Sequence, residues 1–190
     1  MAAVQGSNVL KASQARVYAG DGGVVGAGFL VAGDVLCTCA HVVVRALGLP
    51  GTGPEEAPDQ AVELDFPLLI GRPRVRATVE SWRTGGADVA LLRLEAPVEG
   101  ARPAPLVDGT SVWGHTFRTM GFPVGAGHGV WAYGTLRAGQ GAGWVQMEAD
   151  EPGPRIAKGF SGAPVWDDTQ NGVVGMTVAA HLSERTAYLL

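Results

Sequence analysis

The chain has 190 residues and a net charge of −4, with 46% hydrophobic and 17% charged residues. This composition excludes an intrinsically disordered chain, and the length suits one domain or two halves that share a cleft. The acidic balance and the lack of any block of Lys or Arg argue against a nucleic-acid partner.

The first residues, 1–8, lack the positive and apolar regions of a secretory leader, and no later apolar run reaches the length of a membrane span. We therefore expect a cytoplasmic protein with no membrane partner. Cys37 and Cys39 are the only cysteines. They are too close along one strand for a disulfide, and reduced thiols agree with the expected compartment.

Short runs of β-branched and apolar residues, each closed by Gly, Pro, Asn or Asp, predict an all-β protein. One helix is predicted, at 40–47. About twelve short strands suit a barrel or a sandwich. In chain order the predicted strands are 15–18, 26–31, 35–39, 61–64, 74–82, 89–94, 116–121, 129–136, 144–148, 163–166, 173–179 and 187–190.

Segments rich in Gly, Pro and charge, at 48–60, 139–143 and 150–158, are predicted loops. The proline-containing stretch 96–105 is a candidate link between two halves. The sequence shows no evident internal repeat.

Three short stretches each place one polar side chain among apolar neighbours. They are Thr-Cys-Ala-His-Val-Val at 38–43, Ala-Asp-Val-Ala-Leu-Leu at 87–92 and Gly-Phe-Ser-Gly-Ala-Pro at 159–164. Acyl transfer by serine needs a base, a carboxylate that orients the base, and N–H donors for the oxyanion. Ser161 is the candidate nucleophile, His41 the base and Asp88 the orienting carboxylate, and the N–H groups of Gly159 and Ser161 are the candidate oxyanion donors.

These three stretches, in the order His, Asp, Ser, resemble the signature segments of trypsin-like serine peptidases of the bacterial intracellular type. The likeness covers roughly residues 10 to 190. It implies two six-stranded antiparallel β-barrels, at about 10–100 and 106–190 of a single peptidase domain, with the active-site cleft between them. It implies a serine endopeptidase that acts on protein or peptide substrates without a cofactor.

The sequence departs from that family at two places. Phe160 stands where secreted members carry the aspartate that pairs with a newly freed N-terminus, so that activation switch is absent. Val178 or Thr177 falls where a serine often bonds the triad aspartate. The same alignment puts Arg155, Lys158, Val178, Ala179 and Ala180 around the specificity pocket, where no acid for a Lys or Arg substrate occurs.

Other side chains admit simpler interpretations. Cys37, Cys39 and His41 suggest a metal site, but structural zinc sites usually have four ligands in wider spacings, so we predict no metal. The other histidines, His115, His128 and His181, have no acid or cysteine at an informative spacing and are interpreted as surface or packing residues.

Two alternatives to an endopeptidase stay open. One is a non-enzymatic module of the same fold that holds an extended peptide by strand addition, and the other is an esterase that uses the same triad. Domains resembling this one occur at the N-termini of bacterial signalling and defence proteins. By that analogy the chain is a candidate effector domain with a regulatory domain following Leu190.

Overall fold

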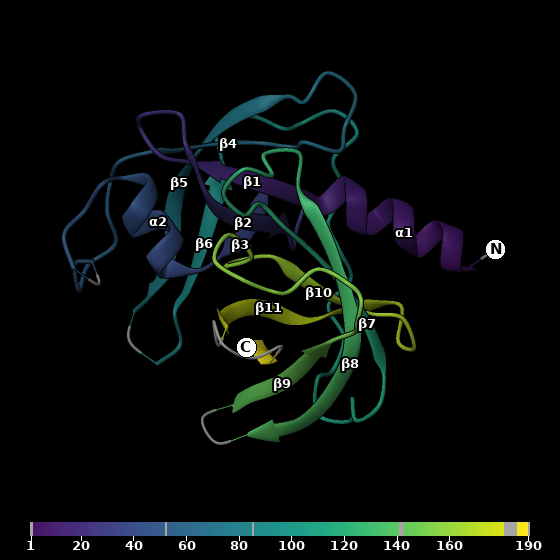
Figure 1. Cartoon of the computed structure of the whole chain (residues 1–190). Coiled ribbons are helices and arrows are strands. Elements are labelled where there is room, and N and C mark those ends of the chain that lie inside the picture. Colours follow the sequence, from purple (N-terminus) through teal and green to yellow (C-terminus); the bar gives the residue numbers. More distant parts are fainter. Residues whose placement is uncertain (1, 52, 85, 141–142, 181–185, 190) are drawn as a thin grey trace.

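Two β-barrels of six strands each make up the body of the protein, with one helix projecting to the side (Figure 1). The structure, a computed structural model, describes residues 2–51, 53–84, 86–140, 143–180 and 186–189. Every strand pair in the two barrels is antiparallel. The predicted all-β class and the two antiparallel barrels are confirmed. No helix of the described part is long and apolar enough to cross a membrane.

The first barrel closes in the order β1-β2-β3-β6-β5-β4 and the second in the order β7-β8-β9-β12-β11-β10. The two halves therefore share one topology, although the sequence shows no repeat. The strands are β1 (Gln14–Tyr18), β2 (Val24–Leu30), β3 (Val35–Thr38), β4 (Val62–Asp65), β5 (Arg74–Arg83), β6 (Val89–Leu94), β7 (Thr116–Gly121), β8 (Val130–Gln140), β9 (Trp144–Ala149), β10 (Pro164–Asp167), β11 (Gly172–Ala180) and β12 (Thr186–Leu189).

Two helices accompany the barrels. The predicted helix is present as α2 (Ala40–Ala46), whose apolar side packs on the first barrel. The second helix, α1 (Ala2–Ser13), was not predicted, because its sequence has Gly6 in the middle and no strong apolar period. Leu10 of α1 is buried, and the Ser13 hydroxyl donates to the Leu10 carbonyl at 2.9 Å. The hydrogen bond lies within α1, whereas the burial of Leu10 in the cluster of the first barrel holds the end of the helix to the body.

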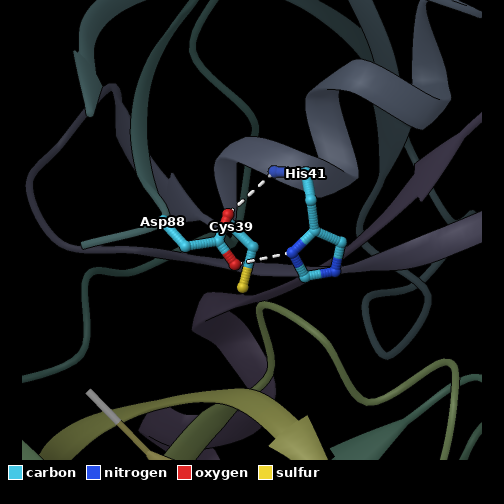
Figure 2. A group of neighbouring side chains, drawn as sticks. All are labelled: Cys39, His41 and Asp88. Atoms are coloured by element: carbon cyan, nitrogen blue, oxygen red, sulfur yellow. Dashed lines mark hydrogen bonds and ion pairs between the residues drawn. The ribbon is translucent and has the colours of Figure 1, made fainter. Parts of the chain in front are cut away.

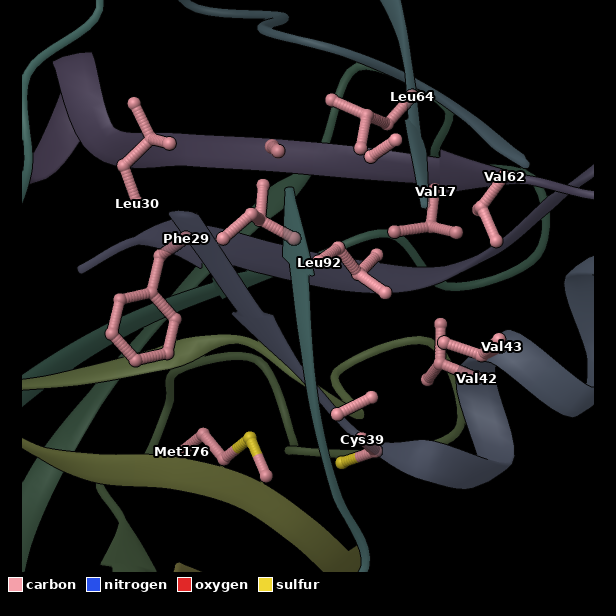
Figure 3. Close-up of a cluster of buried hydrophobic side chains, with 14 of the residues drawn as sticks. Val17, Phe29, Leu30, Cys39, Val42, Val43, Val62, Leu64, Leu92 and Met176 are labelled. Carbon is pink, nitrogen blue, oxygen red and sulfur yellow. The ribbon is translucent and has the colours of Figure 1, made fainter. Parts of the chain in front are cut away.

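The largest hydrophobic cluster fills the first barrel and continues across to the second (Figure 3). Phe29, Val42 and Leu92 belong to the first barrel, and Met176 of β11 joins them from the second. A separate cluster inside the second barrel includes Phe117, Leu136, Met147 and Phe160. The shared cluster holds the barrels against each other, as a site built from both of them requires.

Close packing of β8 on β9 leads to a stability prediction. A Cβ at Gly134 would lie 1.9 Å from the Glu148 carbonyl oxygen. We expect Gly134→Ala to destabilise the protein by about 3 kcal/mol, because the backbone of β9 must move to relieve the collision. Gly139→Ala on the same strand is the matched control, since its Cβ would lie 3.8 Å from the nearest atom. Urea unfolding measures both variants, and equal midpoints would contradict the described packing.

Candidate active site

His41 lies in the first turn of α2, just beyond the end of β3. Cys39, in extended conformation, precedes the helix, and the next residues, Val42 and Val43, are fully buried. These anchors fix the helix while the His41 side chain stays 27% exposed. The apolar residues after the histidine thus hold its ring at the surface of the barrel.

Asp88 precedes β6 in the left-handed backbone region, with φ of 47°. Its Oδ1 accepts the His41 backbone N–H at 2.9 Å, and its Oδ2 lies 2.6 Å from His41 Nδ1 (Figure 2). The Ala40 N–H also donates to the Asp88 carbonyl at 3.2 Å. A carboxylate only accepts hydrogen bonds, so neutral His41 carries its proton on Nδ1 and leaves Nε2 free to accept one.

Ser161 lies in a turn between two glycines with positive φ, Gly159 at 108° and Gly162 at 82°. The Gly162 N–H donates to the Thr177 carbonyl, and the Ser161 carbonyl accepts the Ala27 N–H, both at 2.9 Å. The second of these bonds reaches from the second barrel to β2 of the first. The turn that carries the serine is therefore tied to both barrels.

Glycine at two positions permits the close approach of this turn to α2. A Cβ at Gly26 would lie 2.7 Å from Val42 and 3.0 Å from the Ser161 carbonyl, so this glycine separates the residue after His41 from Ser161. A Cβ at Gly162 would lie 2.6 Å from Thr38 Oγ1. These contacts bring Ser161 beside the start of α2. Within the described residues, no hydrogen bond joins the Ser161 hydroxyl to His41.

The backbone around Gly159 is held by β7 and the residues that follow it. Phe122 N–H donates to the Gly159 carbonyl at 2.8 Å, and a Cβ at Gly159 would lie 2.5 Å from the Phe122 carbonyl oxygen. In the part of the chain that the structure describes, the N–H groups of Gly159 and Ser161 donate to no backbone carbonyl. The role of these two N–H groups as oxyanion donors stays a prediction.

A cavity of about 700 Å³ opens beside the His41–Asp88 pair. Val44, Trp144 and Val178 are among its walls, so the predicted pocket residue Val178 lies close to the pair. Trp144 was not among the predicted pocket residues. Binding residues of this kind carry no local signal, because the loops and strands that bring them together are far apart in the chain.

Four other residues were predicted to line the specificity pocket. Arg155 and Lys158 are exposed on the segment between β9 and β10. Ala179 and Ala180 belong to β11, where they pair with Tyr188 and Ala187 of β12. The side chains of Ala179 and Ala180, and the whole of His181, lie outside the described residues. The role of these four residues in specificity stays a prediction.

Neither Val178 nor Thr177 bonds Asp88 through a hydroxyl. Val178 has none, and the buried Thr177 Oγ1 has no hydrogen-bond partner among the described residues. Cys39 lies near Asp88 instead (Figure 2), and its thiol is 3.5 Å from the Thr177 carbonyl. Burial raises the pKa of the Cys39 thiol well above its usual range, and the charge of Asp88 raises it further. This neighbour was not predicted, because β3 and Asp88 meet only in the folded barrel.

The possible metal ligands that lie together in the structure are not the three that the sequence suggested. Cys39, His41 and Asp88 present ligand atoms that all lie within 4.8 Å of one another. Cys37 is not part of this group, because its Sγ lies 3.9 Å from Met176 Sδ. Burial raises the pKa of the Cys37 thiol to about 12.

A second histidine–carboxylate pair lies in the second barrel. His115 Nδ1 is 2.6 Å from Asp167 Oδ2. Asp167 is fully buried and also accepts the backbone N–H groups of Thr169 and Gln170. This carboxylate therefore stabilises the turn that follows β10. The sequence did not reveal the pair, because its members are far apart in the chain.

Comparisons with known proteins agree with this geometry. A family model described as trypsin-like peptidase domain matches residues 26–176. No curated protein sequence matches the chain significantly.

Similar solved structures are bacterial proteases. The inactive form of the Rv3671c protease superposes with a TM-score of 0.69 at 20% identity, covering 98% of this chain and 88% of that one. The active form from M. tuberculosis gives 0.68 at 21%, covering 97% and 78%. A serine endoprotease from Yersinia pestis gives 0.72 at 14%, covering 98% of this chain but only 61% of its own. These likenesses establish the chymotrypsin-like fold.

Proposed function

Because the chain belongs to the trypsin-like peptidase domain family, we propose that it is a serine endopeptidase with His41, Asp88 and Ser161 as its catalytic triad. The hydrogen bond from His41 Nδ1 to Asp88 Oδ2 at 2.6 Å carries this proposal. It leaves the opposite ring nitrogen as the base, and the serine turn is bonded to the same barrel through the Ala27 N–H.

The proposed reaction is a two-step acyl transfer. Ser161 Oγ attacks the substrate carbonyl carbon while His41 Nε2 takes the hydroxyl proton, and Asp88 stabilises the imidazolium. The N–H groups of Gly159 and Ser161 donate to the oxyanion. His41 returns its proton to the leaving amine as the carbon–nitrogen bond breaks. Water, deprotonated by His41, then hydrolyses the acyl-enzyme and regenerates the Ser161 hydroxyl.

We also propose that the enzyme is cytoplasmic and that a regulatory domain lies C-terminal to this chain. A serine triad can attack an ester as well as an amide, so an esterase with the same triad is the second candidate. A peptide-binding module without catalysis is the third.

One experiment separates the three candidates. The protein is incubated with a peptide library, read by mass spectrometry, and with a small activated ester, read by absorbance. Cleavage of internal peptide bonds supports the endopeptidase. Ester hydrolysis without peptide cleavage favours the esterase, and peptide capture with no hydrolysis of either substrate favours the binding module.

The residue before the cut gives a further prediction. Arg155 and Lys158 are exposed in the segment that leads to Ser161, and a cationic substrate side chain near them is repelled. We expect kcat/KM for Lys or Arg at this position to be at least about tenfold below that for Ala, a difference of about 1.4 kcal/mol.

The matched variants are the double substitution Arg155→Glu with Lys158→Glu, and Arg102→Glu at an exposed site in the link between the barrels. The double variant is expected to raise the relative rate for Lys and Arg substrates, and the control is not. A library profile of the unaltered protein dominated by Lys or Arg would contradict the prediction.

A further inference from the structure

Three different metal-binding side chains converge at the start of α2. Cys39 offers sulfur, His41 nitrogen and Asp88 oxygen, and the ligand atoms lie within 4.8 Å of one another (Figure 2). Zinc accepts all three ligand types, at about 2.0 to 2.3 Å. Tetrahedral bonds of these lengths place neighbouring ligand atoms about 3.3 to 3.8 Å apart. The three side chains therefore need only small adjustments to hold one ion.

Charge and access also suit a divalent ion. A Cys39 thiolate and the Asp88 carboxylate together neutralise Zn²⁺, so the buried site would carry no net charge. His41 and Asp88 line the cavity of about 700 Å³, and their side chains are 27% and 25% exposed. The ion would be reached from the side of His41 and Asp88, because Cys39 is fully buried and is not among the cavity walls. A water from the cavity would be the fourth ligand. Three protein ligands with one open position are typical of reactive zinc sites.

The neighbouring contacts support such a ligand set. Asp88 Oδ1 accepts the His41 backbone N–H, which fixes the carboxylate and leaves Oδ2 for the ion. His41 Nδ1 and Asp88 Oδ2 are now 2.6 Å apart and must separate to about 3.3 Å. His41 is partly exposed and lines the cavity.

We propose that Zn²⁺ binds reversibly to Cys39 Sγ, His41 Nδ1 and Asp88 Oδ2 and thereby switches the catalytic site off. The inhibition rests on the proposed peptidase function, whereas the binding does not. Three bonds from the protein to zinc replace bonds from zinc to water, and the hydrogen bond between His41 Nδ1 and Asp88 Oδ2 breaks. The Cys39 thiol releases its proton to solvent, and no electrons are transferred. Neutral His41 moves its proton from Nδ1 to Nε2. With a proton on Nε2, His41 cannot accept one from Ser161.

The inhibition is tested with buffered free Zn²⁺ in the presence of a phosphine reductant. Covalent labelling by a fluorophosphonate and peptide hydrolysis are measured together. We expect Zn²⁺ to suppress both, and a chelator to restore both. Cys39→Ala and Cys39→Ser should weaken the inhibition at least about 100-fold, because a lost ligand costs more than the 10–100-fold typical of its outer partners.

Cys37→Ser is the matched control, since Cys37 lies outside the cluster on β3. It should keep the inhibition of the unaltered protein. Thermal unfolding checks that each variant is folded. Equal Zn²⁺ sensitivity in folded Cys39 and Cys37 variants would overturn the proposed site.

A second measurement does not depend on activity. Co²⁺ is added to the Ser161→Ala variant, and near-ultraviolet absorption from a cobalt–thiolate bond is recorded. We expect this absorption in Ser161→Ala and in its double variant with Cys37→Ser, but not in the double variant with Cys39→Ser. If it appears while the unaltered protein shows no serine reactivity, the metal site stands and the peptidase function fails. Serine reactivity without the Cys39-dependent absorption overturns the metal site alone.

Discussion

His41→Ala is expected to lower kcat for peptide hydrolysis about 10⁶-fold, the order of loss that follows removal of a triad base. Without Nε2, no positioned group accepts the Ser161 proton or returns it to the leaving amine. The measurement is the initial rate on the best peptide from the library, compared with the unaltered protein at equal concentration.

His115→Ala is the matched control for this prediction. His115 makes a pair with Asp167 at the same 2.6 Å distance as His41 makes with Asp88. Asp167, however, is fully buried and is bonded to the turn after β10. We expect folded His115→Ala protein to retain its kcat within about twofold, since a pair remote from the chemistry adds nothing to the transition state. A large loss of kcat in His115→Ala with none in His41→Ala would contradict the prediction, because catalysis would then depend on the His115–Asp167 pair.

Asp88→Asn is expected to lower kcat about 10⁴-fold while the protein stays folded, because an amide no longer fixes the tautomer of the base. Asparagine tolerates the left-handed backbone at position 88, where φ is 47°. Its side-chain oxygen can still accept the His41 backbone N–H. The backbone is thus retained, and the loss falls on the interaction of the carboxylate with the ring.

The exposed Asp34, which pairs with Arg93 at 2.6 Å on the first barrel, provides the control. Asp34→Asn removes the same charge and should leave kcat unchanged. Circular dichroism and thermal unfolding establish that both variants are folded. A folded Asp88→Asn protein with the kcat of Asp34→Asn would show that Asp88 does not orient the base.

The strands and the all-β class followed from local patterns in the sequence, whereas the arrangement in two barrels was implied by the family resemblance. Each predicted strand corresponds to an observed one, with ends that differ by a few residues, since apolar runs closed by turn residues are recognisable one at a time. The helix after β3 was predicted for the same reason. Helix α1 was missed because its interior contains Gly6, and its end is held by the burial of Leu10, a tertiary contact.

The candidate site was predictable where one short stretch carried the signal. His41, Asp88 and Ser161 each stand out among apolar or glycine neighbours. Cys39 beside Asp88, and His115 beside Asp167, join residues that are distant in the chain. Barrel closure creates these pairs, and no local pattern encodes them. The same holds for Gly26, whose role depends on Val42 and Ser161 lying on either side of it.

If Ser161 is an activated nucleophile, a reagent that reacts only with such serines labels it covalently. The protein, Ser161→Ala and the exposed-site control Ser81→Ala are treated with a fluorophosphonate, and the modified residue is identified by peptide mass spectrometry. We expect one label per molecule, on Ser161, in the unaltered protein and in Ser81→Ala, and none in Ser161→Ala. Undiminished labelling of folded Ser161→Ala protein would contradict this expectation.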